Sequence, residues 1–312
     1  MTNPILDIQN LVVGLGKDPN AKRIIDNISL QVHESETLCV VGESGSGKSV
    51  TSLTVMGLLQ KGALVPSAGS IKLVGEELLS ASDRRLRQLR ATTMAMIFQE
   101  PMTALNPVFR VGSQIAAAIR VHRDVSKNGA MDQAVDLLGQ VGIPDPAQRA
   151  SEYPHQMSGG MRQRAMIAMA LACNPELLIA DEPTTALDVT IQAQILDLMR
   201  NLRSKMDTAI ILITHDLGVV AEMCDRVNVM YAGRIVEQAP VNELFKAPKH
   251  PYTDALIGST PILGHADKPL TTIPGSVPNL IDLPSGCKFS PRCVARLQYN
   301  LEICLHEEPE LR

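Results

Sequence analysis

The eight residues from Gly42 to Ser49, which read Gly-Glu-Ser-Gly-Ser-Gly-Lys-Ser, have the types and spacing of a loop that binds phosphate. Glycines allow successive backbone N–H groups to turn toward an anion, and a helix that begins at the loop adds a favourable dipole. In such a loop Lys48 reaches the β- and γ-phosphates of a nucleotide, and the Ser49 hydroxyl holds Mg²⁺. The alternative is a glycine- and serine-rich turn that matches by chance, and the apolar run 37–41 before the loop argues against it.

An acidic pair, Asp181-Glu182, ends a second apolar run, 177–180. A carboxylate at that position can hold the coordination shell of Mg²⁺ through water, and its neighbour can polarise a water molecule that attacks phosphorus. Acidic strand ends are common, so the pair alone is a weak signal. In a chain with a phosphate-binding loop, it predicts Asp181 as a metal ligand and Glu182 as a general base.

Two further polar residues can act beside a phosphate. His215 follows a third apolar run, 209–213, and a neutral imidazole there can donate a hydrogen bond and orient water. Gln99 follows the apolar pair Ile97-Phe98 and can reach Mg²⁺ or the attacking water. Taken alone, His215 is more simply a strand-end histidine with satisfied hydrogen bonds, and Gln99 carries no signal.

The segment Ser158-Gly159-Gly160 predicts a turn that opens a helix. Its backbone N–H groups can bind an anion because the first turn of a helix leaves them without intrahelical partners. A helix start capped by the Ser158 hydroxyl explains the same residues, and it is the better interpretation of the segment alone.

The elements that position these residues are predicted by the apolar pattern. The runs 37–41, 177–180 and 209–213 are apolar on both faces, which favours buried parallel strands. Apolar residues at helical spacing over 191–206 give a strand–helix–strand unit, and 108–172 is predicted to be helical. Ligands of open α/β sheets bind at the carboxyl ends of strands, where the polar residues above stand.

Composition excludes several classes of protein. Hydrophobic residues make up 45% of the 312 residues and charged residues 20%, which excludes wholesale disorder. The net charge of −4 gives no basic excess for nucleic acid or an anionic membrane surface. No apolar run approaches the roughly 18–20 residues that span a bilayer, and the first residues do not resemble a signal peptide. We therefore expect a cytosolic protein whose six cysteines are not paired in disulfides.

The prolines indicate a boundary along the chain. Ten of the twenty prolines lie between Pro240 and Pro309. We therefore predict a catalytic core over 1–240, which includes the helical segment 108–172, and an irregular, proline-rich extension over 241–312.

The polar motifs occur in one fixed order, and on them the sequence resembles the ATP-binding subunits of ABC transporters. The family's Walker A, Q-loop, signature, Walker B, D-loop and H-loop motifs are matched in turn by Lys48, Gln99, Ser158-Gly159-Gly160, Asp181-Glu182, Asp188 and His215. The resemblance covers nearly the whole of 1–240. It implies an α/β P-loop NTPase cassette, in which a parallel-sheet core carries an antiparallel β subdomain and a helical subdomain.

Two regions narrow the resemblance. Residues 98–107 look like the Q-loop of peptide and nickel importer ATPases. The C-terminal extension of oligopeptide, dipeptide, nickel and glutathione import ATPases is matched by His250-Pro251-Tyr252-Thr253, Ile273-Pro274-Gly275-Ser276-Val277-Pro278 and Gly286-Cys287-x-Phe289-x-Pro291-Arg292-Cys293. The resemblance implies a subunit that couples ATP binding and hydrolysis to uptake of di- or oligopeptides or a related small solute. The alternatives are a nickel, glutathione or opine-type importer ATPase, and a soluble ABC ATPase that acts on DNA or ribosomes.

The resemblance also implies which residues act on ATP. Glu182 is the general base, with His215 and Gln99 fixing the attacking water and the γ-phosphate. Mg²⁺ is held by Ser49, Gln99 and Asp181. The nucleotide-binding residues that the resemblance implies are Gly42, Glu43, Ser44, Gly45, Ser46, Gly47, Lys48, Ser49, Val50, Ser158, Gly159, Gly160 and Asp188.

The family mechanism needs two such chains, because the ATP held by Lys48 of one chain is covered by Ser158-Gly159-Gly160 of the other. The implied partners are therefore a second ATPase subunit, identical or homologous, and two transmembrane permease subunits. An extracytoplasmic solute-binding protein takes part indirectly, and no nucleic acid is involved. The implied location is peripheral, on the cytoplasmic face of the inner membrane.

The sequence departs from the family pattern at three places. Met157 and Met161 replace the usual leucine and glutamine of the signature motif but leave its phosphate-facing residues intact. No aromatic residue precedes Phe98, so none can stack on adenine from upstream of the loop. The guanidinium plane of Arg23 is the nearest candidate for that stacking, and a solvated surface charge is an equally weighted interpretation.

The third departure is a cysteine cluster, Cys287-x5-Cys293-x10-Cys304. In some relatives a fourth cysteine further along completes an iron–sulfur site, and a four-iron cluster needs four thiolates. The chain ends at Arg312 without a fourth, although His306 or a ligand from elsewhere can substitute. We favour free thiols and expect these three cysteines to lie near one another. Cys39, Cys173 and Cys224 lie in apolar segments and are expected to be small buried residues.

Overall fold

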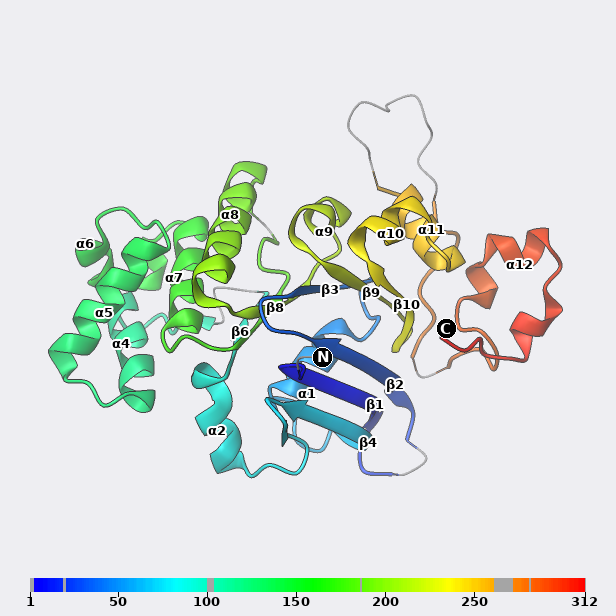
Figure 1. The fold of residues 1–312 in the computed structure, drawn as a ribbon, viewed down its shortest axis with the longest axis horizontal. Helices are drawn as coiled ribbons and strands as arrows, with labels where there is room; N and C mark the ends of the chain where they lie inside the picture. Colours follow the sequence, from blue (N-terminus) through cyan, green and yellow to red (C-terminus); the bar gives the residue numbers. More distant parts are fainter. Residues whose placement is uncertain are drawn as a thin grey trace. The chain divides into compact units, whose positions relative to one another are not determined.

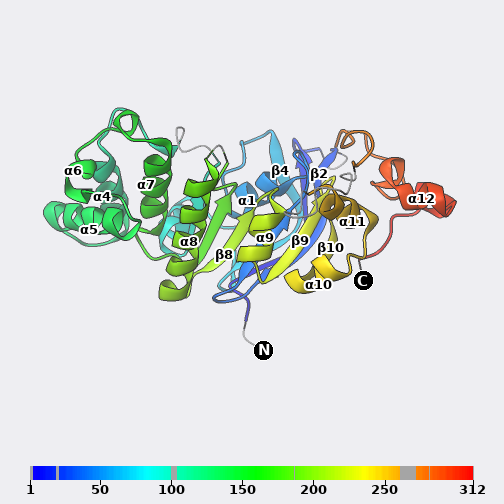
Figure 2. The same cartoon turned by 90° about the horizontal axis from the view of Figure 1, so that it is seen from above.

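A computed structural model of the chain describes residues 3–18, 21–99, 104–185, 187–260, 272–280 and 282–311. The chain forms two compact units, and Figure 1 and Figure 2 draw it from two sides. The first unit comprises Met1–Ile5, Val32–Glu36 and Ser80–Leu212, and the second comprises Leu6–Gln31, Thr37–Leu79 and Ile213–Arg312.

The first unit combines three short strands with a group of helices. Its strands, in the order β8-β7-β6, are β8 (Ala209–Ile213), β7 (Leu177–Asp181) and β6 (Met94–Ile97). β6 and β7 pair in parallel. Its helices are α2 (Asp83–Thr92), α4 (Val111–His122), α5 (Lys127–Gln140), α6 (Pro146–Ala150), the 3-10 turn η1 (Pro154–Gln156), α7 (Gly159–Leu171) and α8 (Val189–Met206).

The helices α4, α5 and α7 pack on one another, and they lie side by side in both views. The face of α5 that enters this core consists of Ala130, Ala134 and Leu138, each fully buried. α4 contributes Ile115 and Ile119, also fully buried. Small alanines on one helix and branched residues on the other allow the two axes to approach closely without leaving a void.

The second unit contains an antiparallel sheet and a further group of three strands. The antiparallel sheet has the order β2-β1-β4-β5, made of β2 (Arg23–Val32), β1 (Leu6–Leu15), β4 (Leu64–Leu73) and β5 (Glu76–Glu77). The other strands, in the order β10-β9-β3, are β10 (Arg234–Pro240), β9 (Arg226–Tyr231) and β3 (Thr37–Val41). β3 and β9 pair in parallel, whereas β9 and β10 are antiparallel.

The helices of the second unit follow these strands. They are α1 (Lys48–Val55), α9 (Leu217–Met223), α10 (Val241–Lys246), α11 (Pro251–Gly258), the 3-10 turn η2 (Ser290–Arg292), α12 (Val294–Gln298) and the 3-10 turn η3 (Glu302–Leu305). The boundary predicted at 240/241 coincides with the end of β10 and the start of α10, and it stays a prediction.

The sequence-based expectations for the fold are confirmed. The runs 37–41, 177–180 and 209–213 form β3, β7 and β8, and every residue of each is buried. Helix α8 covers the predicted stretch 191–206, and 108–172 is largely helical. Within the described residues, none of the helices is long and apolar enough to cross a membrane.

An aromatic cluster attaches the C-terminal segment to β9. Tyr231 at the end of β9 packs on Tyr252 of α11, with ring centroids 4.6 Å apart. The ring of Phe289 lies 5.3 Å from Tyr231 and 5.4 Å from Tyr252. Both tyrosines are fully buried, so the extension adds to the core of this unit rather than lying loosely on its surface.

A half-buried histidine, His250, lies at the start of α11 in this attachment. Its Nδ1 accepts a hydrogen bond of 3.0 Å from the Tyr252 backbone N–H and caps the start of α11. Burial lowers the pKa of His250, and the nearby Glu237 carboxylate opposes that shift. A folded pKa below the unfolded value means that His250 contributes stability fully above the ordinary pKa of 6.5, and the contribution is lost as pH falls below it.

We therefore expect the melting temperature to fall as pH is lowered from about 7 to about 5, because protonation breaks a cap of a kind typically worth about 0.5–2 kcal/mol. His250→Asn keeps a capping oxygen but does not titrate, so its melting temperature should fall less over the same range. Thermal unfolding of both proteins in matched buffers measures this difference. Identical pH profiles would show that His250 is not the group responsible.

Candidate nucleotide-binding site

The loop between β3 and α1 has a backbone that requires glycine at two places. Gly42 has φ +150°, and a Cβ atom there would lie 2.1 Å from the Met230 carbonyl oxygen. Gly47 has φ +104°, and its Cβ would lie 2.6 Å from Ile25 Cδ1. Any side chain at either position would force the loop away from β9 or β2.

The lysine of the loop folds back over the residues that precede it. Lys48 Nζ donates hydrogen bonds of 2.8 Å and 3.0 Å to the carbonyl oxygens of Gly42 and Glu43, and only 6% of the residue is exposed. Ser46 is fully buried, and its hydroxyl has no hydrogen-bond partner among the described residues. Ser44, Gly45 and Ser49 are exposed. The loop thus holds an orphaned buried hydroxyl and a cation, which are groups that can bind phosphate.

Glu43, which was predicted to bind nucleotide with the rest of the loop, is held by the C-terminal segment. Its carboxylate receives two hydrogen bonds from Arg292, of 2.7 Å and 3.0 Å. Its backbone N–H donates to the Tyr252 hydroxyl at 2.9 Å. Sequence reasoning missed the roles of Arg292 and Tyr252, although both lie in the tail motifs that it singled out.

His215 lies in the same unit as the loop, on a turn with fixed geometry. Thr214 is buried, and its hydroxyl accepts a 3.0 Å hydrogen bond from the Asp216 backbone N–H. The Asp216 carboxylate in turn caps α9 by accepting from Gly218 N–H at 2.9 Å. These bonds leave the side chain of His215 exposed at the end of the strand, where it can reach a ligand.

In the first unit the structure brings Gln99 and Glu182 together. Gln99 Nε2 donates a 3.0 Å hydrogen bond to Glu182 Oε2, and Thr185 Oγ1 donates a 2.8 Å hydrogen bond to the same oxygen. Glu182 has φ +47°, a left-handed conformation that is unusual for a residue other than glycine. Asp181, which precedes it, is 5% exposed. The two donors aim the Glu182 carboxylate, and a left-handed backbone at a residue that keeps its side chain is a feature that clusters at functional sites.

Gln163 supports this carboxylate from behind and was missed by the sequence analysis. It is 2% exposed on α7, and its Nε2 donates to the carbonyl oxygen of Pro183, next to Glu182. The bond ties the helix that follows the signature motif to the turn that follows β7. A glutamine just before the apolar stretch 165–171 of this helix was the available signal, since a buried amide needs a partner.

The signature segment serves as a helix start, as its residues predicted. Ser158 caps α7, and its hydroxyl accepts a 3.3 Å hydrogen bond from Met161 N–H. Ser158 and Gly159 are exposed, so both capping and contact with a ligand remain open to them. Met157 is 3% exposed, and its replacement of the usual leucine therefore stays within the apolar core.

The signature segment approaches the start of α8 at Ile191. A Cβ on Gly160 would lie 2.9 Å from Ile191 Cγ2, which makes glycine the fitting residue there. Asp188 caps α8, because its carboxylate accepts a 2.9 Å hydrogen bond from Ile191 N–H. Both motifs thus pack against the same isoleucine.

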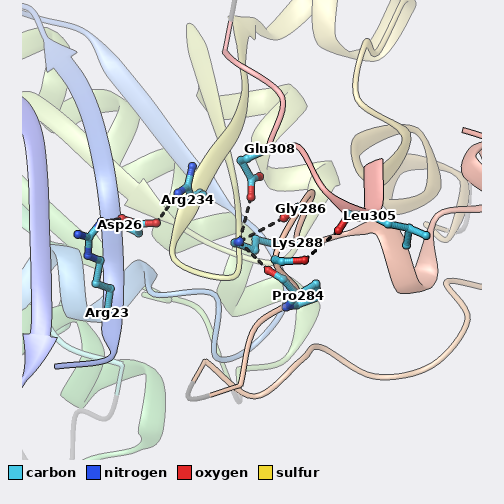
Figure 3. Close-up of polar contacts among 9 residues, drawn as sticks. Arg23, Asp26, Arg234, Pro284, Gly286, Lys288, Leu305 and Glu308 are labelled. Carbon is cyan, nitrogen blue, oxygen red and sulfur yellow. Dashed lines mark hydrogen bonds and ion pairs between the residues drawn. The ribbon is translucent and has the colours of Figure 1, made fainter. Parts of the chain in front are cut away.

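Arg23 lies at the start of β2 beside the loop, because Ile24 and Ile25 approach Gly47. Figure 3 shows that Asp26 accepts from Arg23, at 2.8 Å, and from Arg234. Burial acts to raise the pKa of Asp26, but the hydrogen bonds and charges of the two arginines hold it below its ordinary value. The Arg23 side chain is 59% exposed although its Nη1 atom is held by Asp26.

The three cysteines of the extension lie near one another, as predicted. Cys287 N–H donates a 2.9 Å hydrogen bond to the Cys304 carbonyl oxygen. Burial raises the pKa of the Cys287 thiol, and the charges of Glu308, Cys304 and Cys293 add to that shift. No group of three or more His, Cys, Asp or Glu side chains in the described part of the chain is arranged to hold a metal ion. The extension contains three cysteines, one fewer than the thiolates that a four-iron cluster needs. Cys39, Cys173 and Cys224 are buried.

A glycine-rich loop between a buried strand and a helix, with its lysine turned inward and an aimed carboxylate after another buried strand, defines a P-loop nucleoside triphosphatase. Residues 25–185 match the family described as ABC transporter, and residues 236–299 match the family described as Oligopeptide/dipeptide transporter, C-terminal region. The chain therefore belongs to the ATP-binding proteins of ABC transporters, and it is an ABC ATPase.

Relatives and solved structures agree with this family. A Brucella melitensis relative named for peptide import and ATP binding is 51% identical over 319 residues, which cover 99% of this chain and 93% of the relative. The dipeptide transport ATP-binding protein DppD of Escherichia coli (strain K12) is 49% identical over 307 residues, covering 98% of this chain and 92% of DppD. A dimeric ATP-binding cassette bound to ADP and Pi aligns with TM-score 0.66 and 25% identity, covering 76% of this chain and 98% of the cassette.

The two glycines Gly42 and Gly45 allow a direct test of the loop geometry. Gly42→Ala should destabilise the fold by about 3 kcal/mol or more, because its Cβ meets backbone that cannot move aside. Gly45→Ala is the matched control: its φ is +79° but no atom lies within 4 Å of the added Cβ, so only about 1 kcal/mol of strain is expected. Denaturant unfolding measures both variants, and equal losses would contradict the contact with Met230.

Proposed function

We propose that this chain is the ATP-hydrolysing subunit of an importer that takes up dipeptides, oligopeptides or a related small solute. The observation that supports this most is that about half of the residues are identical to those of relatives named for peptide and dipeptide import, over the extension as well as the core. The core spans 1–240, the helical subdomain about 108–172, and the extension 241–312. The protein acts at the cytoplasmic face of the inner membrane, as a peripheral subunit.

The phosphate site is formed by Gly42–Val50. The Lys48 ammonium leaves the carbonyls of Gly42 and Glu43 and binds the β- and γ-phosphates, which accept charge-assisted hydrogen bonds from it. Backbone N–H groups of the loop and the start of α1 bind the remaining phosphate oxygens. Arg23, held from one side by Asp26, offers its open face to the adenine ring.

The residues proposed for Mg²⁺ fit that ion by their chemistry. Ser49 offers a hydroxyl, Gln99 an amide oxygen and Asp181 a carboxylate, and hard oxygen donors are those that Mg²⁺ prefers. When bound, the ion neutralises charge on the β- and γ-phosphates. The Ser49 side chain is exposed and not committed to the core, which suits a ligand that must reach the ion.

Hydrolysis depends on Glu182 as general base. Gln99 and Thr185 hold one of its carboxylate oxygens and so aim the group that would accept a proton from water. His215 donates to the γ-phosphate and orients the water. Most of the catalytic effect comes from this positioning and from charge stabilisation, as in phosphoryl transfer generally.

Two chains complete each ATP site. Ser158, Gly159 and Gly160 of one chain cover the nucleotide bound by Lys48 of the other, and Asp188 contributes at the same interface. The exposed backbone at Ser158 and Gly159 suits this role. The second ATPase subunit is a copy of this chain or a homologue. The ATPase pair drives two transmembrane permease subunits, which receive solute from an extracytoplasmic binding protein.

Glu182→Gln should retain ATP binding and lose about 10²–10⁴-fold in turnover, because the amide keeps the shape of the side chain but cannot take up a proton. An ATP-bound dimer should accumulate. Steady-state ATPase assays of the transporter measure the loss. Glu176→Gln removes the same charge at the opposite end of β7 and is the matched control. Turnover within a few-fold of the unaltered protein would exclude Glu182 as the base.

Ser158→Arg should leave ATP binding by the isolated chain nearly intact but abolish turnover, since a bulky cation then occupies the turn that covers a partner's phosphate. Ser158→Ala loses only the helix cap, at a cost of about 1 kcal/mol, and controls for that effect. Equilibrium titration with ATP and ATPase assays separate the two results. If Ser158→Arg destroys ATP binding by a single chain, the serine acts on its own nucleotide.

A further inference from the structure

A carboxylate and a guanidinium face each other between the phosphate loop and the C-terminal extension. Arg292 Nη1 lies 2.7 Å from Glu43 Oε2, and Arg292 Nη2 lies 3.0 Å from Glu43 Oε1. The two groups are 249 positions apart in the sequence. This bidentate geometry is the strongest that an arginine and a carboxylate can adopt, and it fixes orientation as well as distance.

The arginine is held rigidly on its own side of the contact. Its side chain is 5% exposed, its Nε donates a 2.8 Å hydrogen bond to the Pro274 carbonyl oxygen, and Nη1 lies 3.3 Å from the Tyr231 hydroxyl. The guanidinium also lies 5.8 Å from the ring centre of Tyr231 and 6.0 Å from that of Phe289. The hydrogen bond to Glu43 raises the pKa of Arg292, so the cation is permanent. A charge fixed in this way acts on Glu43 without the entropy loss of ordering a flexible side chain.

The extension holds the backbone of the loop as well. The Glu43 N–H donates to Tyr252, and Tyr252 is fully buried. The Glu43 carbonyl meanwhile accepts from Lys48. Glu43 is therefore held by the extension and is also one of the two residues that position Lys48, the lysine proposed to bind phosphate.

The charges of Glu43 and Arg292 bear on how the loop binds nucleotide. Glu43 is an acidic residue inside a loop that receives a polyanion, and an uncompensated carboxylate there would repel the phosphates. Arg292 is the compensating charge, and it comes from outside the motif. We propose that Arg292 is a positioning residue for ATP, through which the C-terminal extension sets both the geometry and the charge of the phosphate-binding loop; the proposal rests on the proposed role of that loop.

The test is a charge-rescue series on the full chain, read by equilibrium titration with ATP. Arg292→Met should weaken ATP binding by about tenfold, because it leaves the carboxylate unpaired beside the phosphates. Glu43→Gln alone should raise the affinity, because the carboxylate that repels the phosphates is gone while the cation of Arg292 remains. The double variant should recover to within about threefold of the unaltered protein. Arg292→Lys keeps the positive charge but cannot make both hydrogen bonds to Glu43. Its ATP affinity should therefore lie between that of Arg292→Met and that of the unaltered protein.

Lys288→Met is the matched control for damage to the extension. Figure 3 shows its ammonium bound to the carbonyls of Pro284 and Gly286 and to Glu308, all of them within the extension. Removing that cation loosens the same segment without touching Glu43, so ATP affinity should change by less than about twofold. In the assembled transporter Arg292→Met should raise the KM for ATP by a larger factor than it lowers kcat.

The outcomes separate this proposal from the proposed function. If Lys48→Ala abolishes ATP binding while Arg292→Met binds ATP normally, the loop assignment stands and the role of Arg292 is overturned. If Glu43→Gln and Arg292→Met weaken binding alike and the double variant shows no recovery, the pair is only a structural link. If Lys48→Ala itself binds ATP normally, the function proposed for the loop fails. Should Arg292→Met not fold, the Glu43→Gln and Arg292→Lys variants still decide the sign of the charge effect.

Discussion

Strands that are buried on both faces determine where this protein can place its chemistry. Every residue of β3, β7 and β8 is buried, so no position within them can expose a polar side chain to a ligand without first exposing the core. Reactive groups must therefore come at or just after the last residue of each strand. Gly42 follows β3, Glu182 follows β7, and His215 comes two residues after β8. Each of these predicted site residues therefore stands at the end of a strand, because no position within the strand can expose a polar side chain.

Leaving a buried strand abruptly demands an unusual backbone, and the protein meets that demand in two ways. Gly42 takes a conformation open only to glycine, which brings the loop against the Met230 carbonyl. Glu182 takes a left-handed conformation while keeping its side chain, at a cost of about 1–3 kcal/mol. Hydrogen bonds from Gln99 and Thr185 offset that cost and aim the carboxylate in one direction. Glu182 thus keeps its side chain and is strained, whereas at Gly42 the absence of a side chain avoids the strain.

The parts of the fold and site that could be predicted are those encoded by local patterns. Apolar runs and helical spacing gave the three strands and α8, because burial on two faces or on one face leaves a mark within a few residues. The segment at Ser158 also followed from its own residues, since a hydroxyl before two glycines caps a helix wherever it occurs. Glu182 was predicted from its place after a buried run in a chain with a phosphate-binding loop, and Gln99 from the order of the motifs. Their side chains lie in contact across 83 positions.

The contacts that could not be predicted join residues far apart whose types do not specify a partner. Gln163 and Arg292 are both buried, and a buried amide or guanidinium needs hydrogen-bond partners. The sequence does not indicate which residues those partners are. Arg292 binds Glu43 because the aromatic cluster of the extension packs against Tyr231 of β9 and so holds Arg292 beside the loop.

The phosphate loop therefore depends on more than its own motif. Its first glycine packs against the carbonyl of Met230, and its second residue is held by Tyr252 and Arg292. All three of these residues lie beyond 185, where the match to the ABC transporter family ends, and two lie within 236–299, the match to the C-terminal region. A boundary near 240 divides the sequence by composition, but the hydrogen bonds that hold Glu43 come from residues beyond that boundary. The extension is therefore part of the structure that holds the loop. Substitutions at Tyr252 or Arg292 would act on the loop directly, because both residues are hydrogen-bonded to Glu43.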